Sequence, residues 1–163
     1  MIEVPEPRLS AHIVQDARRT VLTLSGQIDE FSRLGELASQ LVPPLTIDLA
    51  GIRFINSIGV REWVRFLRVL CPLGEVKLRR CSEPMVMQFN MIAGTLGKAE
   101  VESLLAPYEC RACGLEESVE LLVARDLALG LRSAPPERPC PRCGGQLSFA
   151  DSPAHYLLFL GAK

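Results

Sequence analysis

The sequence predicts an α/β protein with a mostly parallel sheet, followed by a small β appendage. Up to residue 106, short apolar segments alternate with single stretches of helical periodicity, the order that builds βαβ units. Beyond Pro107, paired cysteines, prolines and glycines replace this alternation. With 163 residues, 48% of them hydrophobic, the chain is long enough for one compact domain and a small extension. We therefore predict two parts, residues 1–106 and 107–163.

The bounds of the individual elements follow from capping and breaking residues. Asp29 can cap the first helix and Pro43-Pro44 stops it, Ser82 can cap the third, and Gly94 closes that one. Strands are indicated by short runs of apolar residues, and helices by apolar residues three or four positions apart. We predict strands at 11–16, 20–25, 45–49, 75–79, 100–105 and 118–123, and helices at 31–41, 57–70, 82–94 and from Ser152-Pro153 onward.

The turn between the strand 45–49 and the following helix is the most informative segment. The helix opens at Ser57, which places a hydroxyl where backbone N–H groups are unpaired and the helix dipole is positive. A phosphate on Ser57 would be well tolerated there. Asn56 and Ser57 are also ordinary helix caps, and from these residues alone the cap is the simpler interpretation.

The helix 57–70 is amphipathic. An apolar stripe runs along one side and arginines along another. Arg61 and Arg65 could contact an acidic partner, although a row of arginines is also typical of a solvated face. The apolar stripe consists of Val60, Trp63, Val64, Leu67 and Leu70. The row of arginines consists of Arg61, Arg65 and Arg68.

Two CxxCG motifs predict a metal site in the second part. Two thiolates separated by two residues can share one metal ion, and the glycine that follows relieves the tight turn. Four thiolates complete a tetrahedral zinc shell and leave no open position for water or substrate. Disulfides, an iron–sulfur centre and a redox site are the alternatives. We predict one structural Zn²⁺ per chain, bound by Cys110, Cys113, Cys140 and Cys143, in a zinc-ribbon-like extension.

The composition argues against several classes of protein. The chain carries 18 basic and 19 acidic residues, whereas nucleic-acid binders normally show a marked basic excess. The N-terminus does not resemble a signal peptide, and no apolar run is long enough to cross a bilayer. We expect a cytoplasmic protein without membrane insertion, in which thiols stay reduced and the lone Cys71 and Cys81 are buried as small apolar residues.

The sequence contains no pattern that indicates catalysis. Its two histidines, His12 and His155, lie in no catalytic pattern, and there is no phosphate-binding glycine loop. No serine or cysteine stands in a recognisable arrangement with a base. We therefore expect no enzymatic activity.

Together with the order of elements, three segments resemble the STAS domain (sulfate transporter and anti-sigma factor antagonist). They are Leu22–Asp29, Ile47–Leu49 and Phe54–Val60, and the resemblance covers about residues 10–105. It implies a STAS-like sandwich, in which helices pack on one side of a four- or five-stranded sheet. The cysteine-bearing tail departs from the pattern, because such domains usually finish with a last helix.

The resemblance also implies a function. In similar bacterial anti-sigma factor antagonists, the segment at the helix start reads Asp-Ser-(Ser/Thr)-Gly-Leu. Its first serine is phosphorylated by a partner kinase of the histidine-kinase-like ATPase type, which is also the anti-sigma factor. By that match Ser57 is the phosphoacceptor candidate and Asn56 replaces the aspartate. The implied partner-binding residues are Asn56, Ser57, Gly59, Arg61 and Arg65.

Two alternative functions stay open from the sequence. The chain could be a constitutive STAS-type scaffold subunit without phosphorylation, or a zinc-ribbon nucleic-acid-binding protein, which its balanced charge argues against. The helix 82–94 carries many apolar residues for one buried stripe. Some of them could be exposed for a partner or for a homodimer contact, and core packing explains them equally well: Met85, Met87, Phe89 and Met91.

Overall fold

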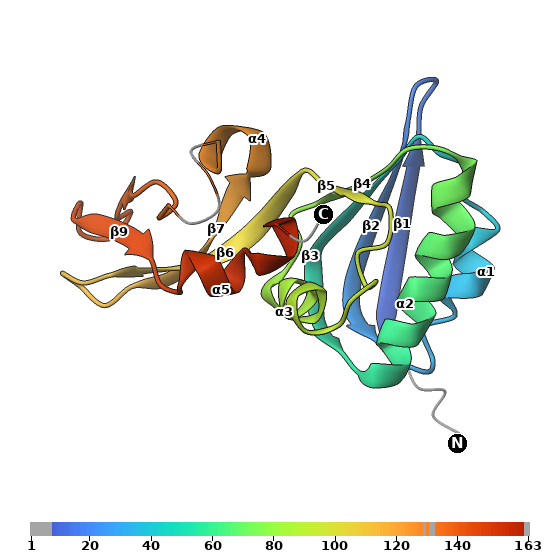
Figure 1. Cartoon of the computed structure of the whole chain (residues 1–163), viewed down its shortest axis with the longest axis horizontal. Coiled ribbons are helices and arrows are strands. Elements are labelled where there is room, and N and C mark those ends of the chain that lie inside the picture. Colours follow the sequence, from blue (N-terminus) through green and yellow to red (C-terminus); the bar gives the residue numbers. More distant parts are fainter. Residues whose placement is uncertain (1–7, 129, 131–132, 162–163) are drawn as a thin grey trace, which may run out of the picture.

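The computed structural model describes residues 8–128, 130 and 133–161. Its strands form two sheets, which Figure 1 shows beside each other along the longest axis of the molecule. Sheet A has the strand order β1-β2-β3-β4-β5, and sheet B has the order β7-β6-β9-β8. The strands of sheet A are β1 (Leu9–Gln15), β2 (Thr20–Ile28), β3 (Leu45–Ile55), β4 (Val76–Arg79) and β5 (Glu100–Val101).

Sheet A confirms the predicted α/β class with a mixed, mostly parallel sheet. β1 pairs with β2 in the antiparallel sense, and the pairs β2–β3, β3–β4 and β4–β5 are parallel. Along β2, buried residues alternate with half-buried ones, as expected when helices cover one face of the sheet. The covering helices are α1 (Leu34–Ala38), α2 (Ser57–Leu70) and α3 (Glu83–Met91), and a 3₁₀ turn, η1 (Cys71–Leu73), follows α2 (Figure 1).

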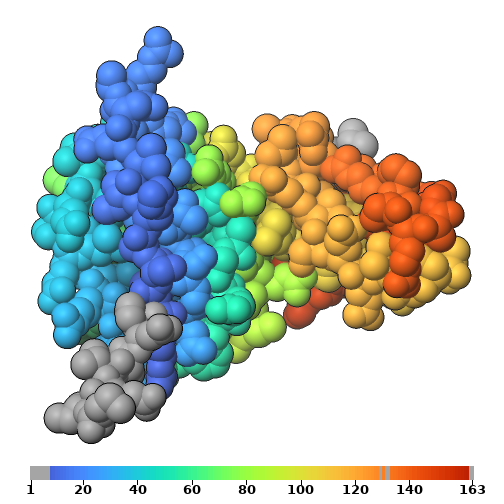
Figure 2. Space-filling model, turned by 180° about the vertical axis from the view of Figure 1, so that it is seen from behind, coloured from blue at the N-terminus to red at the C-terminus, as the bar shows by residue number. Residues whose placement is uncertain are grey.

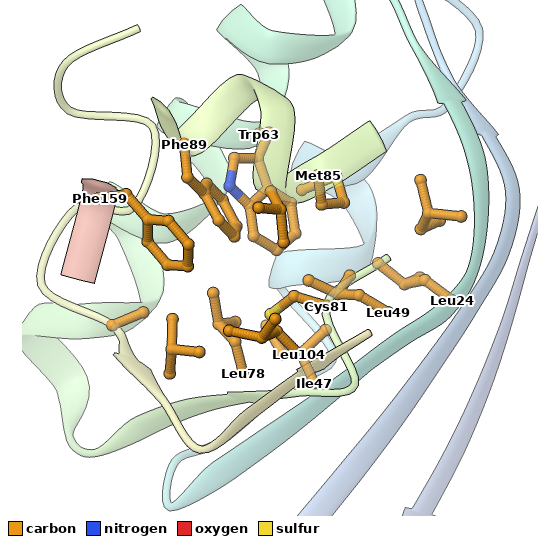
Figure 3. Packing of buried hydrophobic residues seen from close by; sticks show 14 of the residues in the cluster. Leu24, Ile47, Leu49, Trp63, Leu78, Cys81, Met85, Phe89, Leu104 and Phe159 are labelled. Atoms are coloured by element: carbon orange, nitrogen blue, oxygen red, sulfur yellow. The ribbon is translucent and has the colours of Figure 1, made fainter. Parts of the chain in front are cut away.

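The core lies between sheet A and these helices. The whole segment 45–49 is buried at the centre of the sheet. Figure 3 shows Ile47 and Leu49 packed on the side where Trp63 of α2 and Met85 of α3 lie. The stripe predicted on α2 faces this core: Val60, Trp63, Leu67 and Leu70 are buried, and Val64 is partly buried.

β3 is longer than the predicted strand 45–49 and ends at Ile55. Its second half pairs in parallel with the end of β2, with shifts of register on the way. Gly51 permits this close approach, because a Cβ atom on it would lie 2.0 Å from the Oγ of Ser25. The strand therefore ends directly before the turn that starts α2.

Two helices are shorter than predicted. The first was expected over 31–41, with Asp29 as its cap. Asp29 instead accepts a hydrogen bond from the backbone N–H of Phe31 at 3.0 Å, which forms a turn before α1 and leaves the Phe31 side chain outside the helix. α3 ends at Met91, and Gly94, with a φ of 85°, lies beyond it in a turn.

Sheet B forms the β appendage that was predicted after Pro107. All of its strand pairs are antiparallel, and the pair β6–β9 joins the hairpin β6–β7 to the hairpin β8–β9. Each of these hairpins carries one CxxC motif in its turn. The elements are β6 (Ser103–Cys110), β7 (Glu116–Leu122), α4 (Val123–Asp126), β8 (Arg138–Pro139), β9 (Gln146–Phe149), α5 (Pro153–Tyr156) and η2 (Leu158–Gly161).

The two sheets share one continuous core. Cys81, fully buried after β4, forms a parallel bridge with Leu104 of β6. From the C-terminal segment, the Tyr156 hydroxyl donates to the carbonyl of Leu105 at 2.6 Å, and the ring of Phe159 packs 5.4 Å from that of Phe89 on α3. Residues of both parts therefore stand in the same cluster in Figure 3.

The predicted boundary at residue 106 falls inside β6. The predicted strand 100–105 is divided between the sheets at Glu102, whose backbone N–H donates to the carbonyl of Leu78 in sheet A. Figure 2 shows the result as two lobes, one coloured blue to green and one orange to red, which meet at the yellow residues near position 100. The two lobes are thus joined by hydrogen bonds as well as by apolar contacts.

Candidate functional site

The start of α2 is set by Asn56. Its backbone is extended, and its Oδ1 accepts a hydrogen bond from the backbone N–H of Gly59 at 2.7 Å, an N-cap arrangement. The backbone N–H of Asn56 donates to the carbonyl of Ile28 at 3.2 Å, which ties this turn to the end of β2. α2 therefore begins at Ser57, as the sequence predicts, and Asn56 is the residue that caps it.

The other end of the Asn56 amide binds Glu30, a residue that sequence reasoning missed. Asn56 Nδ2 donates to Glu30 Oε2 at 2.9 Å. This hydrogen bond is the main cause that lowers the pKa of the Glu30 carboxyl below its usual value. A negative charge is thus fixed beside the start of α2 without an acidic residue at position 56.

Gly59 has a packing role. It is buried, and a Cβ atom on it would lie 2.0 Å from the carbonyl oxygen of Ile28. No larger side chain fits unless α2 moves away from β2. Gly59 thus sets how closely the helix approaches the sheet, and it lies beneath the surface that Ser57 presents.

Ser57 itself is exposed at the first position of α2. Within residues 8–128, 130 and 133–161 its hydroxyl makes no hydrogen bond. Three apolar side chains of the adjoining segments are also exposed: Phe31 by 66% in the turn before α1, Phe54 by 49% near the end of β3, and Ile58 by 43% in the first turn of α2. We call Ser57 together with these three residues the Ser57 surface.

Arg61 and Arg65 continue from Ser57 along one row of α2, because residues four positions apart lie one turn above each other. Arg65 forms an ion pair with Glu62 at 3.0 Å. Arg61 has no acidic partner among the described residues and is exposed. The structure therefore brings Ser57, Arg61 and Arg65 together on one face.

The four predicted cysteine ligands converge between the two hairpin turns of sheet B. All four sulfur atoms lie within 4.8 Å of one another, with 3.6 Å between the sulfurs of Cys110 and Cys143 and 3.7 Å between those of Cys113 and Cys140. Metal–thiolate bonds of about 2.3 Å in a tetrahedron place the sulfurs about 3.8 Å apart, so the cluster has the size of a tetrahedral metal site. The predicted clustering is confirmed.

The surroundings of the cluster shift the pKa values of Cys113 and Cys143 in opposite directions. The backbone N–H of Leu115 and then the Arg142 guanidinium lower the pKa of Cys113 to about 6. Gly145 donates its backbone N–H to the sulfur of Cys143 at 3.3 Å, which lowers the pKa of that thiol, but the neighbouring thiols outweigh this effect and raise it to about 12. Four thiolates this close need a cation to neutralise them, so the cluster can hold a metal ion.

The remaining predicted positions are also accounted for. Cys81 is fully buried, as expected, whereas Cys71 is only half-buried. His155 is exposed and lies 3.6 Å from Asp151, and it is not part of the cysteine cluster. Among the described helices, none has the length and apolar character that a bilayer span requires.

Comparisons with known proteins give a likeness in structure. No family model matches the chain, and no curated protein matches it. It is similar to a solved structure, "Crystal Structure of an Anti-sigma Factor Antagonist from Mycobacterium paratuberculosis", with a TM-score of 0.42 and 20% identity. The match covers 57% of this chain and 84% of that chain.

Proposed function

We propose that this protein is a non-enzymatic signalling module that binds a protein partner through the Ser57 surface, as an anti-sigma factor antagonist does. The observation that supports this proposal is the exposed Ser57 hydroxyl beside three exposed apolar side chains, Phe31, Phe54 and Ile58. Exposed apolar residues grouped at one edge are typical of protein-binding surfaces. The partner is an ATPase of the histidine-kinase-like type, which phosphorylates Ser57 and then loses affinity for the protein.

A phosphate on Ser57 would act locally. The unpaired N–H groups at the start of α2 and the guanidinium of Arg61, one turn away, would stabilise its charge. The same charge would place a strongly hydrated group among Phe31, Phe54 and Ile58, so that a partner could no longer exclude water from them. Phosphorylation would thus weaken binding without refolding the module.

Mass spectrometry of the native protein tests this proposal. The protein is isolated from its own cells under several growth conditions together with the proteins that co-elute. We expect a fraction of chains phosphorylated at Ser57 and a co-eluting ATPase that transfers phosphate to this residue in vitro. Phosphate on other residues, or Ser57 unmodified under all conditions and by the ATPase, would contradict the switch.

We further propose that the metal held by the cysteine cluster is zinc and that its role is structural. Four sulfur ligands in a tetrahedral arrangement suit Zn²⁺, and they leave no coordination position for a substrate. Elemental analysis of protein purified without added metal should give one zinc per chain. Iron in stoichiometric amount, or no metal, would overturn this assignment.

A scaffold function is the second candidate, and exposed methionines on α3 favour it. Met87 is 56% and Met91 69% exposed, and they lie one turn apart. Ile92, directly after α3, is 40% exposed, and Leu158 of η2, an element that contacts α3, is 56% exposed. A homodimer through this area would dissociate in Met87→Asp. Sedimentation of the wild type as a monomer at all concentrations would exclude it.

A further inference from the structure

A cavity of about 330 Å³ lies between the C-terminal half of α2 and the segment 94–98. One wall is formed by Val64 and Leu67 of α2, and it continues onto Cys71 and Pro72 of η1. Small-molecule pockets measure about 300–1,000 Å³, so the cavity is large enough for a small ligand. It lies at the opposite end of α2 from Ser57.

The opposite wall is open because it is built from glycines. Gly94 and Gly97 have φ angles of 85° and 58°, in the left-handed region that other residues rarely adopt. A Cβ atom on Gly94 would meet nothing within 4 Å. The segment is nevertheless anchored, since the Trp63 indole N–H donates to the carbonyl of Thr95 at 2.9 Å. The cavity is therefore a fixed feature of the fold.

The interior of this cavity offers little to water. Its wall on α2 and η1 carries the aliphatic side chains of Val64 and Leu67, Pro72 and the thiol of Cys71. Burial raises the pKa of that thiol, so it stays protonated and uncharged. Ordered water needs two to four polar partners, which this wall does not provide. The interior suits an apolar group.

The rim carries two positive charges without a counter-charge. Arg68 and Lys98 line the cavity and are exposed, and no acidic residue lines it. Within the described part of the chain neither of them forms an ion pair. An anionic group of a ligand would therefore meet two cations at the mouth, while its apolar part enters the cavity.

We propose that this cavity binds a linear amphiphilic carboxylate, a free fatty acid of medium chain length. The alkyl chain lies along Val64, Leu67 and Pro72, and the carboxylate lies between Arg68 and Lys98. The proposal is independent of Ser57 and of any protein partner.

Trp63 provides the signal for a test. It is the sole tryptophan of the chain, and it is bonded to the segment that lines the cavity. Full-length protein is titrated with octanoate below its micelle concentration, and with octanol and butyrate as controls. We expect saturable binding of octanoate, followed by tryptophan fluorescence and by calorimetry, with an affinity at least ten-fold higher than for either control.

Variants separate the two halves of the site. The double variant Arg68→Gln, Lys98→Gln should weaken octanoate at least ten-fold and leave octanol unchanged, because both side chains are exposed and the apolar wall is intact. Val64→Phe, which fills the cavity, should weaken both ligands. Arg18→Gln, which removes one positive charge in the exposed turn between β1 and β2, should bind octanoate like the wild type.

Two results would overturn the proposal. One is the absence of saturable octanoate binding to the wild type by both methods. The other is equal affinity of the double variant and of Arg18→Gln for octanoate, with circular dichroism showing that both are folded. Equal binding of octanol and octanoate by the wild type would likewise remove the role of the two cations.

Discussion

At the scale of residues, Asn56 links the fold to the Ser57 surface. Its amide accepts from the backbone N–H of Gly59 and donates to Glu30, and both contacts use the chemistry of an amide. An aspartate at this position could cap the helix but could not donate to Glu30, and it would place two carboxylates against each other. Asn56 and Glu30 therefore form a pair, and neither of them is hydrogen-bonded to the Ser57 hydroxyl.

The pair gives a first prediction. Asn56→Ala removes the cap of α2 and should lower the free energy of unfolding by about 1 kcal/mol. Asn56→Asp keeps a capping oxygen and should be less destabilising than the alanine variant, although it loses the bond to Glu30. Urea denaturation of the wild type and the two variants measures their order of stability. An aspartate variant less stable than the alanine variant would show that repulsion between the new carboxylate and Glu30 outweighs the cap.

Asp48 gives a second prediction, on pH dependence. Its side chain is 1% exposed and accepts hydrogen bonds from Arg79 at 3.0 Å and from Arg80 at 2.7 Å. Burial raises the pKa of this carboxyl, but the bonds from Arg80, the Ala50 N–H and Arg79 outweigh that effect and lower it overall.

The folded-state pKa of Asp48 lies below its unfolded value of about 3.9. The stabilisation of the fold by the ionised carboxylate is therefore complete well above that pH, and it is lost as the pH falls through the folded-state pKa. At pH 7, Asp48→Asn should reduce the free energy of unfolding by about 1.5–3 kcal/mol. The difference between wild type and variant should shrink towards pH 2 in urea denaturation. A difference that stays constant with pH would contradict this role of the ionised carboxylate.

At the scale of elements, the sequence best predicts the helices and strands whose bounds are marked by neighbouring residues, such as a cap and an apolar period. α2 has its predicted bounds, Ser57–Leu70, because the cap and the apolar period coincide. Ser82 and Ser152 stand at N-cap positions, yet neither side chain makes a capping hydrogen bond. The extension of β3 depends on contact with β2, which no local pattern encodes.

The same distinction applies to the candidate site. The cysteine cluster was predictable, because a CxxC spacing carries its own geometry. Phe31, Phe54 and Ile58 could not be recognised as a surface, since apolar residues next to strands usually enter the core. Glu30 was missed because its partner Asn56 lies on another strand end.

Metal removal tests the two hairpins of sheet B. Cys143→Ala should abolish stoichiometric zinc, and hydrogen exchange should then quicken in the turns that carry the cysteines, because the metal ties these turns together. Exchange in β2 and β3 of sheet A should change little. Cys71→Ala, a cysteine outside the cluster, should keep one zinc per chain. Unchanged exchange in the hairpin turns of the zinc-free variant would contradict this structural role.

At the scale of the whole molecule, the appendage is part of the same core as sheet A. Asn90 of α3 donates to the carbonyl of Tyr156 at 2.9 Å and accepts from the backbone N–H of Phe159 at 2.8 Å. Leu104 is fully buried against the first sheet. The C-terminal segment thus covers α3.

A truncated chain, residues 1–106, tests this dependence. It would expose Phe89 and Leu104, lose the hydrogen bonds of Asn90, and cut β6 in the middle. We expect it to be aggregated or to lack a cooperative thermal transition, whereas the full chain unfolds cooperatively. A truncated chain that is soluble and melts cooperatively would show that residues 1–106 form an independent domain.

The affinity of the purified partner ATPase for Ser57 variants tests the proposed function most directly. Isothermal titration calorimetry should give Ser57→Ala the affinity of the wild type and Ser57→Asp an affinity at least ten-fold lower. Ser10→Asp, the same change on the exposed strand β1, should bind like the wild type. Equal affinities of Ser57→Ala and Ser57→Asp would contradict a switch at this surface.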